Sequence, residues 1–137
     1  HMVSTGYGRI ILLSGGGAAY ANPTFPAYSA SKTALVRIAE NLHEELLKKG
    51  DFSTICLAPG AVQTKMLEQV KKAGGVVKTE CTIDEPVDFV IRFLSIKNNL
   101  LSGRLIHVKD NWSELDQISN KELLDKYWKL RRVEKFE

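Results

Sequence analysis

The chain has 137 residues, of which 44% are hydrophobic and 26% charged, and its formal net charge is +3. This size suits one compact domain, and the hydrophobic fraction is typical of a globular protein rather than a disordered one. The longest apolar runs, such as Ile10–Leu13, fall far short of the roughly 20 residues that span a bilayer. No secretory leader is recognisable, and the charges are interspersed, which argues against a nucleic-acid binder.

The cysteine and histidine content argues against both a disulfide framework and a metal site. Cys56 and Cys81 are the two cysteines, and neither belongs to a metal-binding spacing. We therefore expect no metal and a reducing, cytoplasmic location. His1 and Met2 resemble residues left by an expression tag, so residues 1–2 are left out of the fold prediction.

Three short apolar runs, at residues 9–14, 53–58 and 103–109, predict strands that are buried on both faces. Helical periodicity predicts a long helix over residues 28–49 and further helices at 64–72, after Pro86 and at 121–134. Residues 18–27 contain two prolines and predict a loop, whereas residues 76–84 are ambiguous. Strands that alternate with helices predict an α/β fold of about three parallel strands with crossover helices, a small sheet with exposed edges.

Tyr28 and Lys32 lie four residues apart at the start of the long predicted helix, so their side chains share one face. A tyrosine has an ordinary pKa of about 10, and a neighbouring ammonium group favours the phenolate. The pair could therefore move a proton, although by itself it also fits an ordinary surface contact. Ser14 ends the preceding strand, and the segment Pro59–Thr64 follows the next one. All three elements lie at the carboxyl ends of the strands, where open α/β sheets bind ligands.

The serine, the Tyr-Ser-Ala-Ser-Lys segment and the later Pro-Gly-Ala-Val-Gln-Thr resemble the short-chain dehydrogenase/reductase family. The resemblance implies a doubly wound, Rossmann-like parallel sheet and hydride transfer between NAD or NADP and an alcohol or ketone. It implies that Tyr28 is the general acid/base, that Lys32 lowers its pKa and binds the nicotinamide ribose, and that Ser14 orients the substrate oxygen. It also implies that Pro59, Gly60 and Val62 line the nicotinamide pocket and that Thr64 holds the cofactor's carboxamide or phosphates.

One position departs from the family pattern. Members usually have the catalytic serine thirteen residues before the tyrosine, and Gly15 stands there in this chain. Either the glycine-rich loop carries one extra residue and Ser14 takes the role, which we favour, or the role is lost. The simpler interpretation of Ser14 is that it caps the strand end.

The resemblance covers only part of the family's fold. The glycine-rich turn that binds the dinucleotide precedes the serine strand in the family, and Gly15–Gly17 is followed here by a proline-containing loop instead of a helix. We therefore expect residues 3–112 to be the C-terminal half of such a domain and residues 113–137 to be a helical tail packed on it. The chain alone is expected to be inactive and to form a homodimer or larger assembly. The alternative function is that of a non-catalytic binding or scaffold protein derived from the family.

Overall fold

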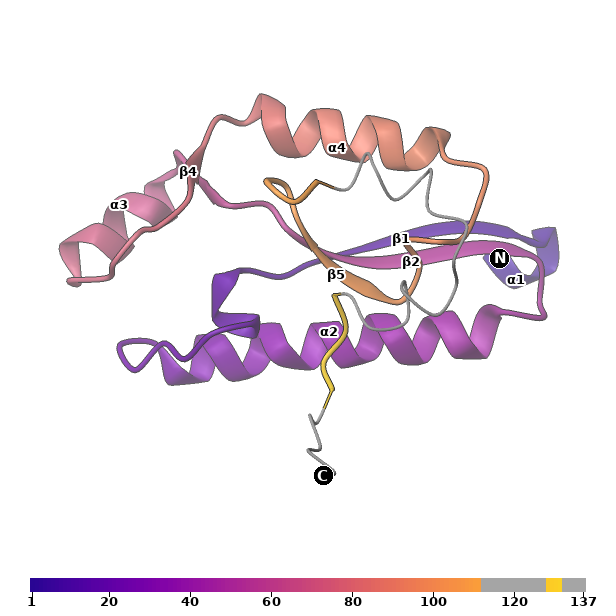
Figure 1. Ribbon diagram of the computed structural model, residues 1–137, viewed down its shortest axis with the longest axis horizontal. Helices are drawn as coiled ribbons and strands as arrows, with labels where there is room; N and C mark the ends of the chain where they lie inside the picture. The colour runs from indigo at the N-terminus through magenta and orange to yellow at the C-terminus, as the bar shows by residue number, and fades with distance from the viewer. Residues whose placement is uncertain (112–127, 132–137) are drawn as a thin grey trace, which may run out of the picture.

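The computed structural model describes residues 1–111 and 128–131. Its elements are, in chain order, α1 (Met2–Thr5), β1 (Tyr7–Leu13), the 3-10 helix η1 (Gly16–Ala18), α2 (Pro26–Leu46), β2 (Asp51–Ala58), β3 (Ala61–Val62), α3 (Lys65–Lys72), β4 (Glu80–Cys81), α4 (Asp84–Ser95) and β5 (Arg104–His107) (Figure 1). Within the described ranges, no helix is long and apolar enough to cross a membrane.

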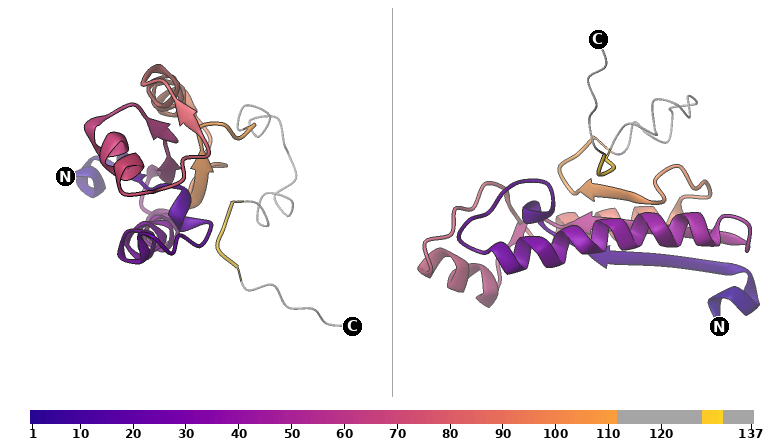
Figure 2. Two further views of the ribbon diagram at one scale, coloured as in Figure 1. Left: turned by 90° about the vertical axis from the view of Figure 1, so that its left-hand side faces the viewer. Right: turned by 90° about the horizontal axis from the view of Figure 1, so that it is seen from below.

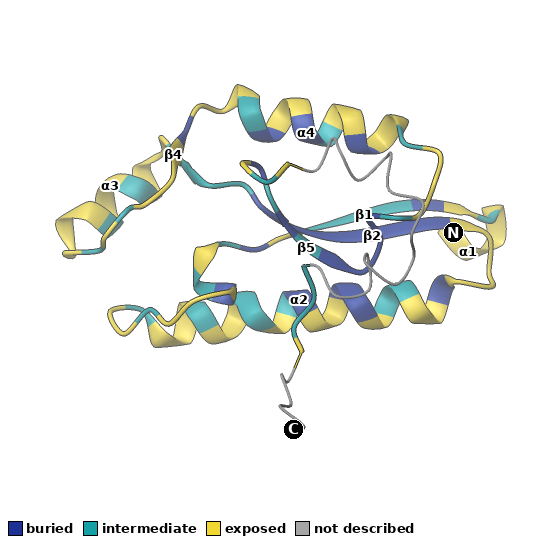
Figure 3. Ribbon diagram, in the orientation of Figure 1, coloured by how far each residue is buried: buried dark blue, intermediate teal, exposed yellow. Residues whose placement is uncertain are grey.

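The main sheet has three parallel strands in the order β1-β2-β5, which confirms the predicted α/β fold. All three predicted strands form, with ends that differ by a few residues. Central strand β2 is buried from Phe52 to Ala58, because it has a strand on each side and a helix on each face (Figure 3). A continuous apolar run is the sequence signature of such a strand.

The side chains of β2 alternate between two cores. Ile55 and Leu57 pack with Phe89 and Phe93 of α4, whereas Cys56 packs in a second cluster with residues of α2. The two helices therefore lie on opposite faces of the sheet (Figure 1). Because the steps from β1 to β2 and from β2 to β5 go the same way across the sheet, the two crossovers have opposite hands. One of them is left-handed, which is the rare hand for parallel strands.

Four short elements were not predicted, namely α1, η1, β3 and β4. Met2, although left out of the fold prediction, begins α1. Its sulfur lies beside Gly8, where a Cβ added to the glycine would be 2.8 Å from it. Strands β3 and β4 form a separate two-stranded parallel sheet, and β4 lies in the ambiguous segment 76–84. Elements of two to four residues are too short for a periodic pattern, so only their tertiary partners specify them.

The prediction of a helix over residues 121–134 is wrong for the part of this range that the structure describes. Residues 128–131 are not helical, and the rest of that range lies outside the described residues. The backbone N–H of Leu105 donates to the Trp128 carbonyl oxygen at 2.8 Å. Trp128 and Leu130 pack against the two different cores. This segment therefore runs along the outer edge of β5, an arrangement that the apolar residues of the tail permit as readily as a helix.

Glu40 connects α2 to this C-terminal segment. Glu40 is only 7% exposed. Its carboxylate forms ion pairs with both Arg37 and Arg131. Burial acts to raise the pKa of the Glu40 carboxyl, but the hydrogen bond from Arg131 and the charges of Arg131, Arg37 and Lys129 outweigh it and hold the pKa below its usual value. The charged form of Glu40 therefore contributes to stability.

Replacing Glu40 with Gln is expected to destabilise the protein by about 2 kcal/mol at neutral pH, the usual scale for a hydrogen bond to a charged group. Because the folded pKa is depressed, the Glu40 contribution is fully present above the unfolded pKa and is lost as the pH falls through the folded one. Urea unfolding at several pH values measures this. The variant and the wild type should converge in acid, and an equal difference at every pH would contradict the assignment.

Candidate functional site

The candidate site lies at the carboxyl ends of β1 and β2. Parallel strands bring these ends to one edge of the sheet, and the start of α2 returns to the same edge after the loop that contains η1. Figures 1 and 2 show α3, η1 and the start of α2 together at this end of the molecule. The three sequence segments predicted to converge do so.

Tyr28 and Lys32 are brought together on one side of α2. The Lys32 ammonium lies 5.5 Å from the centre of the Tyr28 ring and donates a hydrogen bond to the Leu13 carbonyl oxygen at 2.9 Å. This bond attaches the lysine to the last residue of β1. Tyr28 itself is 41% exposed.

Ser14 is adjacent to this pair but is turned into the fold. It is 5% exposed, and its hydroxyl donates to the Lys32 carbonyl oxygen at 3.1 Å. Below it, burial raises the pKa of the Cys56 thiol, opposed by a hydrogen bond with Ser14 and by the charge of Lys32. The Ser14 hydroxyl therefore bonds to the backbone of α2 and is buried at the end of β1.

Gly15 is the strand-end residue beside the Tyr28 hydroxyl. A Cβ atom built on Gly15 would lie 2.5 Å from the Tyr28 Oη atom. Next in the same loop, a Cβ on Gly17 would lie 2.6 Å from the Ser29 Oγ atom. The glycines therefore let this loop lie directly on the start of α2, a role different from binding a phosphate.

An apolar groove of about 420 Å³ opens between the end of the sheet and α4. Three of the residues predicted to bind the cofactor, Pro59, Val62 and Thr64, are among its lining residues, whereas Gly60 is not. The α4 side of the groove, with Ile83, Val87 and Ile91, was not anticipated. Its signal is present in the sequence, since these residues recur every four positions and widen the apolar face of α4 beyond what the core covers.

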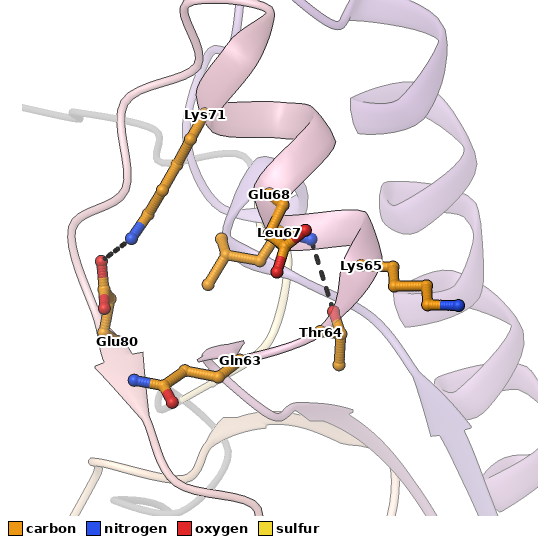
Figure 4. Close-up of a pocket in the computed structure, with 7 residues that line it drawn as sticks. All are labelled: Gln63, Thr64, Lys65, Leu67, Glu68, Lys71 and Glu80. Atoms are coloured by element: carbon orange, nitrogen blue, oxygen red, sulfur yellow. Dashed lines mark hydrogen bonds and ion pairs between the residues drawn. The ribbon is translucent and has the colours of Figure 1, made fainter.

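A second, polar hollow of about 490 Å³ lies on the other side of Thr64 (Figure 4). Its lining residues are Gln63, Thr64, Lys65, Leu67, Glu68, Lys71 and Glu80. The Thr64 hydroxyl caps α3 by accepting a hydrogen bond from the Leu67 N–H at 3.4 Å. Lys71 and Glu80 form an ion pair at 2.5 Å across the hollow, and Lys65 extends away from that pair. Sequence reasoning missed this hollow because the pairing of β3 with β4 creates it.

A sequence profile of the family described as short chain dehydrogenase matches residues 1–74, more than half of the chain. The chain belongs to the short-chain dehydrogenase family. A curated relative, the 2-dehydro-3-deoxy-L-rhamnonate dehydrogenase (NAD(+)) of Sphingomonas sp. (strain SKA58), is 33% identical over 72 residues. That match covers 53% of this chain and 28% of the relative.

Solved structures of short-chain dehydrogenases share the fold. An NAD+-bound xylitol dehydrogenase superposes with a TM-score of 0.68 at 18% identity, covering 77% of this chain and 49% of that one. A putative NAD(P)-dependent gluconate 5-dehydrogenase from Beutenbergia cavernae gives 0.66 at 23% identity, covering 82% and 48%. This chain therefore spans about half the length of these structures and 28% of the curated relative.

The groove of this family member suits one part of the cofactor that its relatives bind. Its apolar walls fit a flat nicotinamide ring, and the Thr64 hydroxyl adds one polar group. The cluster Gly15–Gly17 does not cradle a pyrophosphate, since Gly16 and Gly17 belong to the 3-10 helix η1 and do not lead into an α-helix whose N-terminus could bind it. Within residues 1–111 and 128–131 there is also no group of three His, Cys, Asp or Glu residues suited to a metal ion.

Gly60 lies in the turn between β2 and β3, against Cys81 of β4. Its φ of +76° lies in the left-handed region, and an added Cβ would lie 2.8 Å from the Cys81 sulfur and 3.2 Å from the Thr79 carbonyl oxygen. The Cys81 thiol donates to the Pro59 carbonyl oxygen at 2.9 Å. Glycine at this position therefore lets β4 lie directly against the turn that follows β2.

Replacing Gly60 with Ala is expected to destabilise the protein by more than the usual cost of about 1–2 kcal/mol for a side chain in the left-handed region, because β4 must also move. Gly74 provides the matched control, since its φ is +78° but nothing lies within 4 Å of an added Cβ. Urea unfolding of Gly60→Ala and Gly74→Ala isolates the packing contribution. Equal losses in the two variants would show that β4 does not rest on Gly60.

Proposed function

We propose that this chain is the catalytic half of an NAD(P)-dependent oxidoreductase that acts on an alcohol or ketone. The observation that supports this most directly is the placement of the Lys32 ammonium at the end of β1, next to the exposed ring of Tyr28. Tyr28, the Lys32 cation and an apolar groove then all lie at the edge of a parallel sheet where such ligands bind. Leu13, which accepts the hydrogen bond from Lys32, lines that groove. Membership of the short-chain dehydrogenase family supports the same assignment.

In this proposal Tyr28 gives a proton to the substrate oxygen during ketone reduction and takes one from it during alcohol oxidation. Lys32 places a positive charge beside the phenol and offers its remaining N–H groups to the ribose. Pro59 and Val62 hold the ring of the cofactor through apolar contact, Gly60 permits the turn between them, and Thr64 supplies a hydroxyl. The nicotinamide, when bound, supplies or accepts the hydride.

Residues 3–112 are proposed to be only part of the catalytic unit. The chain spans about half of the similar solved structures, and the glycine cluster Gly15–Gly17 is not a cradle for the pyrophosphate. Another stretch of polypeptide must then bind the dinucleotide, NAD or NADP, and this chain alone would not turn over. Xylitol and gluconate, for which two similar structures are named, are the first substrates to test.

A non-catalytic role as a binding or scaffold protein is the second candidate. It is favoured by Gly15, which stands where the family usually has its serine and lies directly against the Tyr28 hydroxyl. The two candidates differ in what the loss of that hydroxyl would do.

In an enzyme assembled with a dinucleotide-binding half, Tyr28→Phe is expected to reduce turnover by about 10²–10⁴-fold, the usual contribution of general acid/base catalysis. Tyr7→Phe is the matched control, because Tyr7 is 51% exposed and begins β1, at the opposite end of that strand from the site. NAD(P)H absorbance follows the reaction. If the Tyr28→Phe and wild-type enzymes turn over at the same rate, Tyr28 is not the acid/base residue.

The partner we propose for the isolated chain is a second copy of itself. No described strand pairs with β1 on the side away from β2, whereas the outer edge of β5 is covered at Trp128. Beside the bare edge, Leu13 is 56% and Ile91 60% exposed. A bare apolar edge favours pairing with another chain. An antiparallel arrangement of two α4 helices would also place the acidic first turn of each beside the basic last turn of the other.

Light scattering at micromolar concentration is expected to give the mass of a dimer or larger assembly, and Ile91→Lys is expected to reduce it to that of a monomer. Ile38→Lys is the matched control, because Ile38 is 45% exposed but lies on α2. A wild-type monomer would refute the proposed assembly. Dissociation by Ile38→Lys alone would move the interface to α2.

A further inference from the structure

Ser14 and Gly15 are neighbours in the chain but face different surroundings. The Ser14 side chain is directed inward, where its hydroxyl donates to the Lys32 carbonyl oxygen at 3.1 Å and the residue is only 5% exposed. A side chain at residue 15 would instead be directed toward Tyr28, since an added Cβ would lie 2.5 Å from the Tyr28 Oη atom. Successive residues of an extended chain point to opposite sides, so one position cannot take the place of the other without rebuilding the strand end.

We propose that residue 15, and not residue 14, is the substrate-orienting position of this site, and that the glycine there leaves the position without a hydroxyl. Ser14 is instead a positioning residue for Lys32. This inference rests on the proposed function in that it assigns roles around the same Tyr28. It reverses the choice of Ser14 that the sequence favours. The site then offers an incoming substrate oxygen the Tyr28 hydroxyl and the bare backbone of Gly15.

The contacts of Ser14 explain how it acts through Lys32. Its hydroxyl holds the Lys32 backbone, its own N–H donates to the Leu57 carbonyl oxygen at 2.7 Å, and the Lys32 side chain returns to the Leu13 carbonyl oxygen at 2.9 Å. These three bonds connect β1, β2 and α2 at one point. Ser14 is only 5% exposed, so reaching a ligand would require it to give up the bond to α2.

Nothing in the backbone requires glycine at residue 15. Its φ of −177° and ψ of 172° describe extended backbone that any residue adopts. The three atoms nearest to an added Cβ all belong to the Tyr28 ring and hydroxyl, and Tyr28 is 41% exposed and can therefore shift. Gly15→Ser would bring a hydroxyl next to the Tyr28 hydroxyl, and Gly15→Ala would bring the same Cβ without one, so the two variants form a matched pair.

The test compares Gly15→Ser, Gly15→Ala and Ser14→Ala in the enzyme assembled with its dinucleotide-binding half, measuring kcat, KM and the midpoint of thermal unfolding. We expect the kcat of Gly15→Ser to exceed that of Gly15→Ala by about tenfold or more, because a donor aimed at the reacting oxygen acts mainly on kcat. Ser14→Ala should lower kcat by less than about tenfold and the unfolding midpoint by about 3–5 °C, as the loss of one buried hydrogen bond does.

The inference is overturned if the kcat of Gly15→Ser is no higher than that of Gly15→Ala. It is equally overturned if Ser14→Ala lowers kcat by about 100-fold or more with an unchanged unfolding midpoint, the behaviour of a direct donor to the substrate. If neither the wild type nor Tyr28→Phe turns over, the proposed function fails separately. The crystal structure of Gly15→Ser and the unfolding midpoint of Ser14→Ala then decide the inference. A new hydroxyl within 3.5 Å of the Tyr28 Oη atom, the ordinary limit of a hydrogen bond, together with a lowered midpoint, supports it, and any other result overturns it.

Discussion

The burial of β2 on both faces is the constraint on which the rest of the structure depends. From Phe52 to Ala58 every residue of this strand is buried, and its alternating side chains form the centre of two cores, one under α4 and one under α2. Parallel pairing on both sides then aligns the carboxyl ends of β1 and β2. The position of the site is a consequence, because Ser14 and Pro59 both follow strand ends that this pairing has set side by side.

Close backbone approach determines the local shape of the site. Gly15 lies against the Tyr28 hydroxyl, and Gly60 lies against β4. In both places a Cβ atom would enter the space of a neighbour, so a side chain at residue 15 would displace the Tyr28 ring and one at residue 60 would displace β4. The Lys32 bond to the Leu13 carbonyl oxygen adds a polar connection at the same point. Tyr28 and Lys32 are thus held by packing and hydrogen bonds that belong to the fold itself.

Long elements with a clear period were predictable, and short ones were not. The three main strands and α2 were anticipated because apolar runs and helical spacing extend over several residues. Strands β3 and β4 have two residues each and exist only through each other. Segment 128–131 lies along the edge of β5 although its apolar residues also suit a helix, since an unpaired N–H on a strand edge is satisfied by any backbone carbonyl that reaches it. The groove could not be predicted from the sequence either, because its α4 wall meets Pro59 and Val62 only after the chain has folded.

The sequence by itself determined the class of fold and the pairing of Tyr28 with Lys32, because buried strands, helical periodicity and a spacing of four residues are local patterns. It also showed that residue 15 departs from the family pattern, because the spacing of thirteen residues before Tyr28 can be counted in the sequence. Only the tertiary structure decided which way Ser14 and Gly15 face, since that depends on how the end of β1 lies on α2. A one-residue change of register reverses the direction of a side chain on an extended strand, and no local pattern records which register the packing selects.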